Sequence, residues 1–125
     1  MIDRLALCNE VLAPWPFERQ CAHAAALGYR GLEVAPFTLA DDPLAISAAE
    51  AARLARVAAD HGLAICGLHW LLVAPAGLSI ASPDPGVQAR TRDALHRLVD
   101  LSLGAARALG ITARGVVTVR LTILR

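Results

Sequence analysis

The stretch Leu27-Gly-Tyr-Arg-Gly-Leu-Glu-Val34 decides the predicted fold, because it joins the end of an amphipathic helix to a short apolar strand. Gly28 is the expected C-cap of that helix, since glycine adopts the left-handed conformation at little steric cost. The same order of helix, glycine, short turn and strand recurs around Gly62 and Gly110. The loops that leave the strands are longer than those that enter them. This asymmetry is typical of βα barrels and open parallel sheets, which place their chemistry at the carboxyl ends of the strands.

The chain of 125 residues is expected to form a single α/β domain, with about four parallel strands alternating with three helices. The predicted strands cover residues 4–9, 31–35, 63–69 and 115–125. The predicted helices cover residues 17–27, 47–61 and 85–109. A complete eight-unit barrel needs roughly 200 residues or more, so this order of elements predicts a partial TIM-type (β/α) barrel.

Two helix starts have recognisable capping residues. Ser47-Ala-Ala-Glu50 matches a capping box, in which the Ser47 and Glu50 side chains each satisfy a free backbone amide of the first turn. Ser82 is the expected cap of the third helix, which begins near Asp84 or Pro85. These positions predict where the long loops end.

Composition excludes several classes of function. The formal net charge is +1 and the twelve basic residues are spread along the helices, so no nucleic-acid partner is expected. No apolar stretch reaches the ~20 residues of a membrane span, and the N-terminus lacks the pattern of a signal peptide. Cys8, Cys21 and Cys66 lie in apolar runs without metal-type spacing. They are expected to be buried reduced thiols, which favours a cytoplasmic protein.

Glu33 is the first candidate for chemistry, because it lies between two apolar residues on the second strand. Alternation places Leu32 and Val34 on the face toward the helices and Glu33 on the other face, toward a barrel axis. A carboxylate there needs a metal, an arginine or a hydrogen-bond network to offset its desolvation. The alternative is a structural glutamate paired with a basic neighbour such as Arg4.

His69 ends the third strand, on the face that simple alternation shares with Ile65 and Gly67. An imidazole at the carboxyl end of a strand can ligate a metal, orient a hydroxyl or exchange a proton. The adjacent Trp70 could supply an apolar platform of the kind found in carbohydrate sites. The alternative is a hydrogen-bonded histidine that fixes the loop.

The remaining candidates lie in the loops that follow the strands. Asn9 and Glu10 end the first strand, where they would contact substrate or cap the loop. Trp15 and Phe37 would form the wall of a pocket, or belong to the core. No G-x-G-x-x-G, phosphate-loop or G-x-S-x-G motif is present, so nucleotide-binding and hydrolase readings lose their main support.

Taken together, several motifs suggest a family. Cys8-Asn-Glu10, Pro16-Phe17 with Cys21, Leu27-Gly-Tyr-Arg-Gly-Leu-Glu-Val34 and Gly67-Leu-His-Trp70 resemble the opening half of a sugar phosphate isomerase/epimerase. These enzymes belong to the xylose isomerase-like TIM barrel superfamily, and the resemblance covers roughly residues 3–110. It implies a small sugar or sugar phosphate as substrate and a divalent metal, often Mn, Mg, Co or Zn. It also implies metal-assisted proton transfer next to a carbonyl.

The resemblance places Glu33 and His69 at positions that face the site, and it makes His69 the one transferable metal ligand. Most ligands and both catalytic acids of these relatives come from later strands. Residues 111–125 depart from the family pattern, so we expect a truncated barrel whose site is incomplete in this chain. We expect catalytic activity only from an intact parent protein.

Three alternatives stay open at this stage. In the first, the chain alone binds no metal. In the second, it is a non-catalytic half-barrel that binds a ligand or forms a homodimer through an exposed strand edge. In the third, it resembles a type IV apurinic endonuclease, which is a zinc phosphodiesterase. The last reading is weakened because the sequence shows no basic surface for DNA.

Overall fold

The computed structural model describes residues 5–108, with side chains described through Asp100. Three strands form a parallel sheet in the order β1 (Ala6–Cys8), β2 (Gly31–Val34) and β3 (Ala64–Leu68). They alternate with three helices, α1 (Phe17–Ala26), α2 (Ala48–Asp60) and α3 (Pro85–Ala108). Short 3-10 helices lie in the loops after the first two strands, at Asn9–Leu12, Pro36–Thr38 and Pro43–Ala45.

The predicted α/β class and the parallel, alternating arrangement are therefore confirmed. Within residues 5–108 the sheet is an open one of three strands and does not close into a barrel. The strand predicted at 115–125 and the divergent segment 111–125 lie outside the described residues, as does Arg4, the alternative partner of Glu33.

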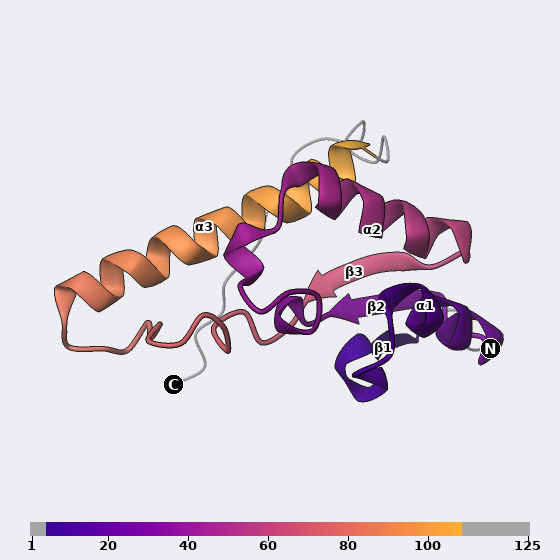
Figure 1. Cartoon of the computed structure of the whole chain (residues 1–125), viewed down its shortest axis with the longest axis horizontal. Coiled ribbons are helices and arrows are strands. Elements are labelled where there is room, and N and C mark those ends of the chain that lie inside the picture. The colour runs from indigo at the N-terminus through magenta and orange to yellow at the C-terminus, as the bar shows by residue number, and fades with distance from the viewer. Residues whose placement is uncertain (1–4, 109–125) are drawn as a thin grey trace.

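Consecutive strands of the sheet are neighbours, which determines where the helices lie. Each parallel crossover is expected to be right-handed, so the connecting helices cover the same face. Figure 1 shows α2 lying along β3, with α3 packed against α2. The long loop between β3 and α3 runs below α3 in this view. No helix within the described range has the length and apolar character to cross a membrane.

The core lies between the sheet and the helices. Leu32 and Val34 are buried and pack in one cluster with small residues of α1 and α2. The buried members of this cluster are Cys21, Ala24, Leu32, Val34, Ala58 and Leu63. Because Leu32 and Val34 face the helices, the intervening Glu33 lies on the opposite face, as alternation predicts.

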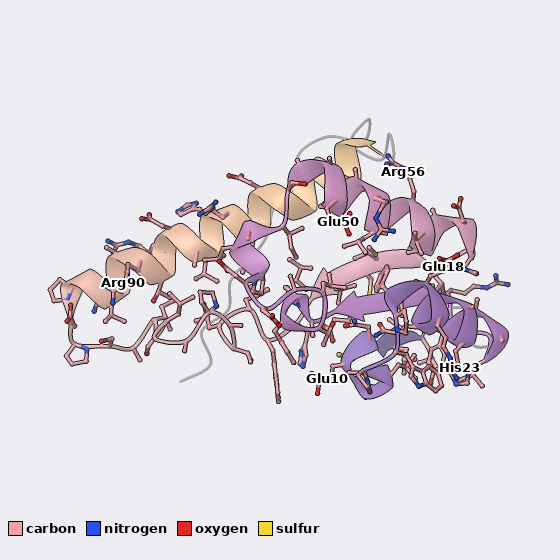
Figure 2. The ribbon with its side chains drawn as sticks, in the orientation of Figure 1. Glu10, Glu18, His23, Glu50, Arg56 and Arg90 are labelled. Atoms are coloured by element: carbon pink, nitrogen blue, oxygen red, sulfur yellow. The ribbon has the colours of Figure 1, made fainter. Side chains whose placement is uncertain are left out.

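Two glycines end helices as predicted, since Gly28 has a φ of 87° and Gly62 a φ of 72°. At the start of α2, the Ser47 hydroxyl accepts a hydrogen bond from the Glu50 amide at 3.1 Å. The Glu50 carboxylate pairs with Arg53 and not with the Ser47 amide, so only half of the predicted capping box forms. Figure 2 labels Glu50 and Arg56 on α2, and Glu10 below the strands in this view.

Asp84, and not Ser82, caps α3, so the predicted cap was wrong by two residues. The Asp84 Oδ1 atom accepts hydrogen bonds from the amides of Gly86 and Val87, at 2.6 and 3.2 Å. The Ser82 hydroxyl accepts only from the Asp84 amide, outside the helix. The reason is that Pro85 occupies the first helical position, where its missing N–H costs nothing, which leaves Asp84 as the capping residue.

A bulge in β3 changes which of its side chains face the site. Leu32 pairs with Ile65, but Glu33 pairs with Gly67, so Cys66 is an extra residue. The prediction that His69 shares a face with Ile65 was therefore wrong, because the bulge reverses the alternation between them. Gly67 now lies beside Glu33, and the His69 amide donates to the Val34 carbonyl at 2.9 Å.

The three cysteines differ in exposure, contrary to the prediction that all are buried. Cys21 is fully buried, Cys8 is half-buried and Cys66 is exposed, because β3 is the edge strand of the described sheet and bulges at this residue. Burial, with a smaller contribution from the Glu18 carboxylate, raises the pKa of the Cys21 thiol to about 11.

We expect iodoacetamide at mildly alkaline pH to label Cys66 in the folded protein and to label Cys21 only after unfolding. The reason is that Cys21 is inaccessible and, with its pKa near 11, remains a thiol until the pH approaches that value. Peptide mapping by mass spectrometry measures the order of labelling, and Cys66→Ser should remove the fast signal. Labelling of Cys21 at a rate comparable with Cys66 in the folded protein would contradict this assignment.

Candidate functional site

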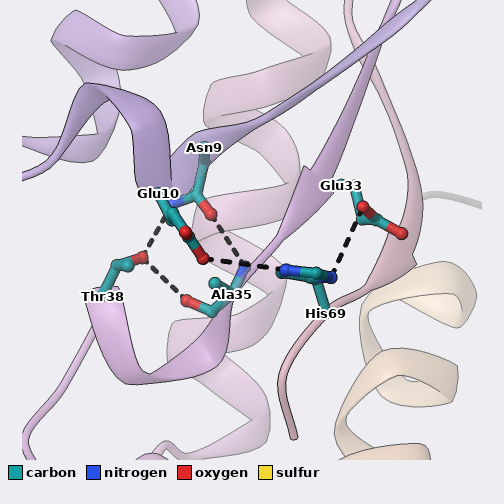
Figure 3. Close-up of polar contacts among 6 residues, drawn as sticks. All are labelled: Asn9, Glu10, Glu33, Ala35, Thr38 and His69. Atoms are coloured by element: carbon teal, nitrogen blue, oxygen red, sulfur yellow. Dashed lines mark hydrogen bonds and ion pairs between the residues drawn. The ribbon is translucent and has the colours of Figure 1, made fainter.

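The carboxyl ends of the three strands bring together Glu10, Glu33 and His69. Glu10 follows β1, Glu33 is in β2 and His69 follows β3. Figure 3 shows the His69 ring lying between the two carboxylates. The Nε2 atom of His69 is 3.7 Å from Glu10 Oε2, and its Nδ1 atom is 3.7 Å from Glu33 Oε2. The structure thus brings together Glu33 and His69, predicted to carry the chemistry, and Glu10, predicted to contact substrate or cap the loop.

The site is partly open to solvent. The His69, Glu10 and Glu33 side chains are 32%, 30% and 45% exposed. Both 3.7 Å separations exceed the ~3.2 Å limit of an ordinary N–H···O hydrogen bond. Oxygen Oε2 of Glu10 is itself buried and has no hydrogen-bond partner within the described range. A buried carboxylate oxygen of this kind requires a nearby proton donor or cation to offset its lost hydration.

Cys8 extends this group of residues toward metal chemistry. One ligand atom from each of Cys8, Glu10 and His69 lies within 4.8 Å of the other two. The set comprises one sulfur, one oxygen and one imidazole nitrogen donor. These donors fit a divalent ion that accepts sulfur and nitrogen ligands, such as zinc or cobalt, better than magnesium, which prefers oxygen. The buried, unpartnered Oε2 atom of Glu10 is a second feature that a cation would satisfy.

A buried amide network holds the ends of β1 and β2 in place. Asn9 is fully buried, and its Oδ1 atom accepts from the Ala35 amide at 2.7 Å. Its Nδ2 atom donates to Gln20 Oε1 at 3.0 Å and to Thr38 Oγ1 at 2.7 Å. Figure 3 shows Asn9 and Thr38 meeting at Ala35, to whose carbonyl Thr38 donates. The geometry fits the loop-capping alternative for Asn9, because both of its donors and its acceptor are engaged.

Gln20 and Thr38 are structural residues that sequence reasoning missed. Gln20 is buried and donates from Nε2 to the Trp15 carbonyl at 2.7 Å. One signal for it was available, because Gln20 falls between Phe17 and Ala24 at the spacing of the apolar stripe of α1. A glutamine at such a position requires a buried hydrogen-bond partner. For Thr38 the sequence offers no comparable signal.

Aromatic rings lie beside His69. The Trp70 ring stacks on His69 with centroids 5.3 Å apart and on Phe37 at 6.2 Å. Trp70 is 57% exposed and has a φ of 52°, a conformation that is uncommon for a non-glycine residue. Phe37 and Trp70 are therefore brought together with His69. Trp15, by contrast, packs its ring against His23 and under Arg19, so its aromatic contacts lie on α1.

Comparison with known proteins gives no match to a family model, to a curated protein or to a solved structure. The resemblance to sugar isomerases consequently stays a prediction that rests on the quoted motifs.

Proposed function

We propose that this chain carries the first-half residues of a sugar phosphate isomerase/epimerase-type site, which moves a proton next to the carbonyl of a small sugar or sugar phosphate. The observation that supports the proposal best is the line Glu10–His69–Glu33 with 3.7 Å on each side of the imidazole. This line lies beside the stacked rings of Trp70 and Phe37. It combines carboxylates, an imidazole and an apolar platform at the end of a parallel sheet.

Glu33 is the proposed proton acceptor. Its Oε2 atom faces His69, while Oε1 lies beside Gly67, where a β-carbon would be 3.9 Å away. Because Gly67 has no side chain, space remains next to Oε1. In the proposed step, the proton leaves the carbon next to the carbonyl for the Glu33 carboxylate, and the C–H electron pair forms an enediolate. Returning the proton to the former carbonyl carbon, while the hydroxyl proton moves to the former carbonyl oxygen, converts aldose to ketose. Epimerisation would require a second acid on the opposite face of the enediolate, to return a proton to the original carbon.

His69 and the aromatic rings orient the substrate in this proposal. The carboxylates of Glu10 and Glu33 lie beside the two ring nitrogens and fix the orientation of the imidazole, which borders the space proposed for the sugar. The exposed Trp70 face contacts the C–H side of the sugar. A divalent ion, when bound, polarises the carbonyl oxygen.

Solvent-deuterium exchange tests the proposal. A panel of triose to hexose sugars and their phosphates is incubated with the protein in D2O, with and without added divalent ions, and ¹H NMR follows loss of the proton next to the carbonyl. We expect exchange with at least one phosphate ester. Glu33→Gln should slow it by about 100-fold or more, the usual contribution of a general base. The matched control Glu18→Gln, at an exposed position of α1, should leave the exchange rate unchanged.

Exchange that persists in Glu33→Gln, or no exchange with any member of the panel, would contradict the proposal. A separate binding measurement is possible because Trp15 and Trp70 are the two tryptophans of the chain. Trp15→Phe leaves Trp70 as the sole tryptophan, so sugar binding at the proposed platform should change the tryptophan emission.

A second candidate function is a non-catalytic module that pairs with another copy of itself. The observation that favours it is the edge that β3 forms within the described sheet, where Ala64, Ile65 and Cys66 are all exposed and Ile65 is 38% accessible. An unpaired edge strand can pair with the same strand of a second copy about a two-fold axis.

For this candidate, we expect sedimentation velocity to show a dimer that Ile65→Lys converts to monomer. Val11→Lys, at a 64% exposed site in another loop, serves as the matched control and should stay dimeric. A chain that remains monomeric across the accessible concentration range would exclude this mode of assembly.

A further inference from the structure

We propose that Cys8, Glu10 and His69 form a three-ligand site for a zinc-type divalent ion, with Glu33 positioning the imidazole. This inference deepens the proposed function by naming its ion, and it rests on that function only for what the ion does. Binding of the ion depends only on the geometry of the three side chains. They come from the ends of β1 and β3, which flank β2 in the sheet.

The separations match those of ligands around one ion. Zinc bonds of about 2.0 to 2.3 Å in a tetrahedral arrangement hold their ligand atoms roughly 3.3 to 3.8 Å apart. The 3.7 Å between His69 Nε2 and Glu10 Oε2 lies in this range and is too long for a hydrogen bond. The Cys8 sulfur completes a group whose atoms are all within 4.8 Å of each other. Small side-chain rotations would bring the three donors into a common coordination sphere.

The environment of Glu10 supports the same conclusion. Its Oε2 atom is buried and makes no hydrogen bond within the described range, since His69 Nε2 at 3.7 Å is too distant for one, although the rest of the side chain reaches solvent. A carboxylate oxygen that has lost its hydration without gaining a donor is unfavourable. A cation between Glu10, Cys8 and His69 removes that penalty at Oε2 of Glu10.

The sulfur ligand determines which ion binds. Thiolate and imidazole donors favour zinc and cobalt(II), whereas magnesium takes oxygen ligands and retains its water. Three protein ligands leave a fourth position, and the partly exposed side chains keep that position accessible. Sites with three protein ligands and one open position are the kind that act on substrates, whereas structural zinc sites are closed by four.

Glu33 completes the arrangement through the other imidazole nitrogen. Its Oε2 atom is 3.7 Å from Nδ1, on the side of the ring away from Glu10. A carboxylate on that side favours the tautomer that carries the proton on Nδ1, which directs the lone pair of Nε2 toward the ion. Glu33 is therefore a positioning residue for the metal, and it is distinct from the three ligands.

Cobalt(II) alone, added to the purified full chain, is the probe. We expect visible absorption of a low-symmetry cobalt site and a sulfur-to-cobalt charge-transfer band that saturates at one ion per chain, displaced by zinc but not by magnesium. Cys8→Ser should abolish the charge-transfer band, and the matched control Cys66→Ser, on exposed β3, should retain it. Glu33→Gln should retain the band but weaken binding by about 10- to 100-fold, as loss of such a carboxylate does at other metal–histidine sites.

His69→Asn provides a second test at a partly exposed position and does not depend on how Cys8→Ser folds. It should weaken cobalt binding by at least about tenfold, with an unchanged far-ultraviolet circular dichroism spectrum. The proposal is overturned by a wild-type chain without the charge-transfer band, by a band that Cys66→Ser removes, or by His69→Asn binding as tightly as wild type. Cobalt binding without deuterium exchange would support the metal site while contradicting the proposed function, so the two failures are distinguishable.

Discussion

Asn9→Ala is expected to lower the free energy of unfolding by about 3 to 5 kcal/mol, because each buried partner left unsatisfied costs roughly 1 to 3 kcal/mol. The substitution leaves the Ala35 amide, the Gln20 carbonyl oxygen and the Thr38 hydroxyl without their contacts to Asn9. Three such losses in one network are not additive, which is why the expected total is below their sum. Urea denaturation followed by circular dichroism measures the change.

Thr38→Val is the matched control, because it removes two outer contacts of the same network, from Asn9 Nδ2 and to the Ala35 carbonyl, and leaves the Ala35 amide bonded to Asn9. It should cost about 1 to 2 kcal/mol, since each of the two hydrogen bonds has a net value of about 1 kcal/mol. If Asn9→Ala were no more destabilising than Thr38→Val, the network would not be what joins the ends of β1 and β2.

Leu32→Ala is expected to cost about 3 to 4 kcal/mol, in the range found for fully buried leucines that leave a cavity. Leu32 has no exposed surface and packs between α1 and α2 in the middle strand of the described sheet. Leu32 is enclosed by the other buried members of this cluster, so its truncation leaves a cavity. The same denaturation experiment measures this change.

Ile65→Ala provides the comparison, since Ile65 is the direct partner of Leu32 across the β2–β3 ladder. It is 38% exposed, so its truncation should cost about 1 kcal/mol or less. Equal costs at the two positions would mean that β3 is as well covered as β2, which contradicts the exposure of Ile65 at the edge of the described sheet.

The parts of the fold that local chemistry controls were predictable from the sequence. Gly28 and Gly62 mark helix ends because each adopts a positive φ, which glycine favours and which depends on the local backbone alone. Glu33 was placed on the correct face because β2 is paired on both sides and keeps strict alternation. In β3 the same reasoning failed at Cys66, because a bulge depends on the fit to a neighbouring strand and not on the residue's own pattern.

The candidate site was predictable to a similar extent. Glu33 and His69 were identified because polar residues at the carboxyl ends of parallel strands converge. For Cys8 the sequence predicts only a reduced thiol. The other two members of its cluster, Glu10 and His69, do not form a recognisable metal-binding motif with it in the sequence. The sequence could not decide whether Asn9 contacts substrate or caps the loop. Its partners Gln20 and Thr38 become its neighbours only when the strand ends meet in the fold.

The bulge also bears on how this chain tolerates changes in length. Between Ile65 and Gly67, β3 contains one residue more than its ladder with β2 uses. A shorter chain without Cys66 would restore regular alternation, with Gly67 still opposite Glu33 and Leu68 still opposite Val34. An added residue after Gly67 would instead turn His69 toward the helices. Deletion of Cys66, the extra residue of β3, is therefore compatible with the site. Insertion of a residue after Gly67 is not.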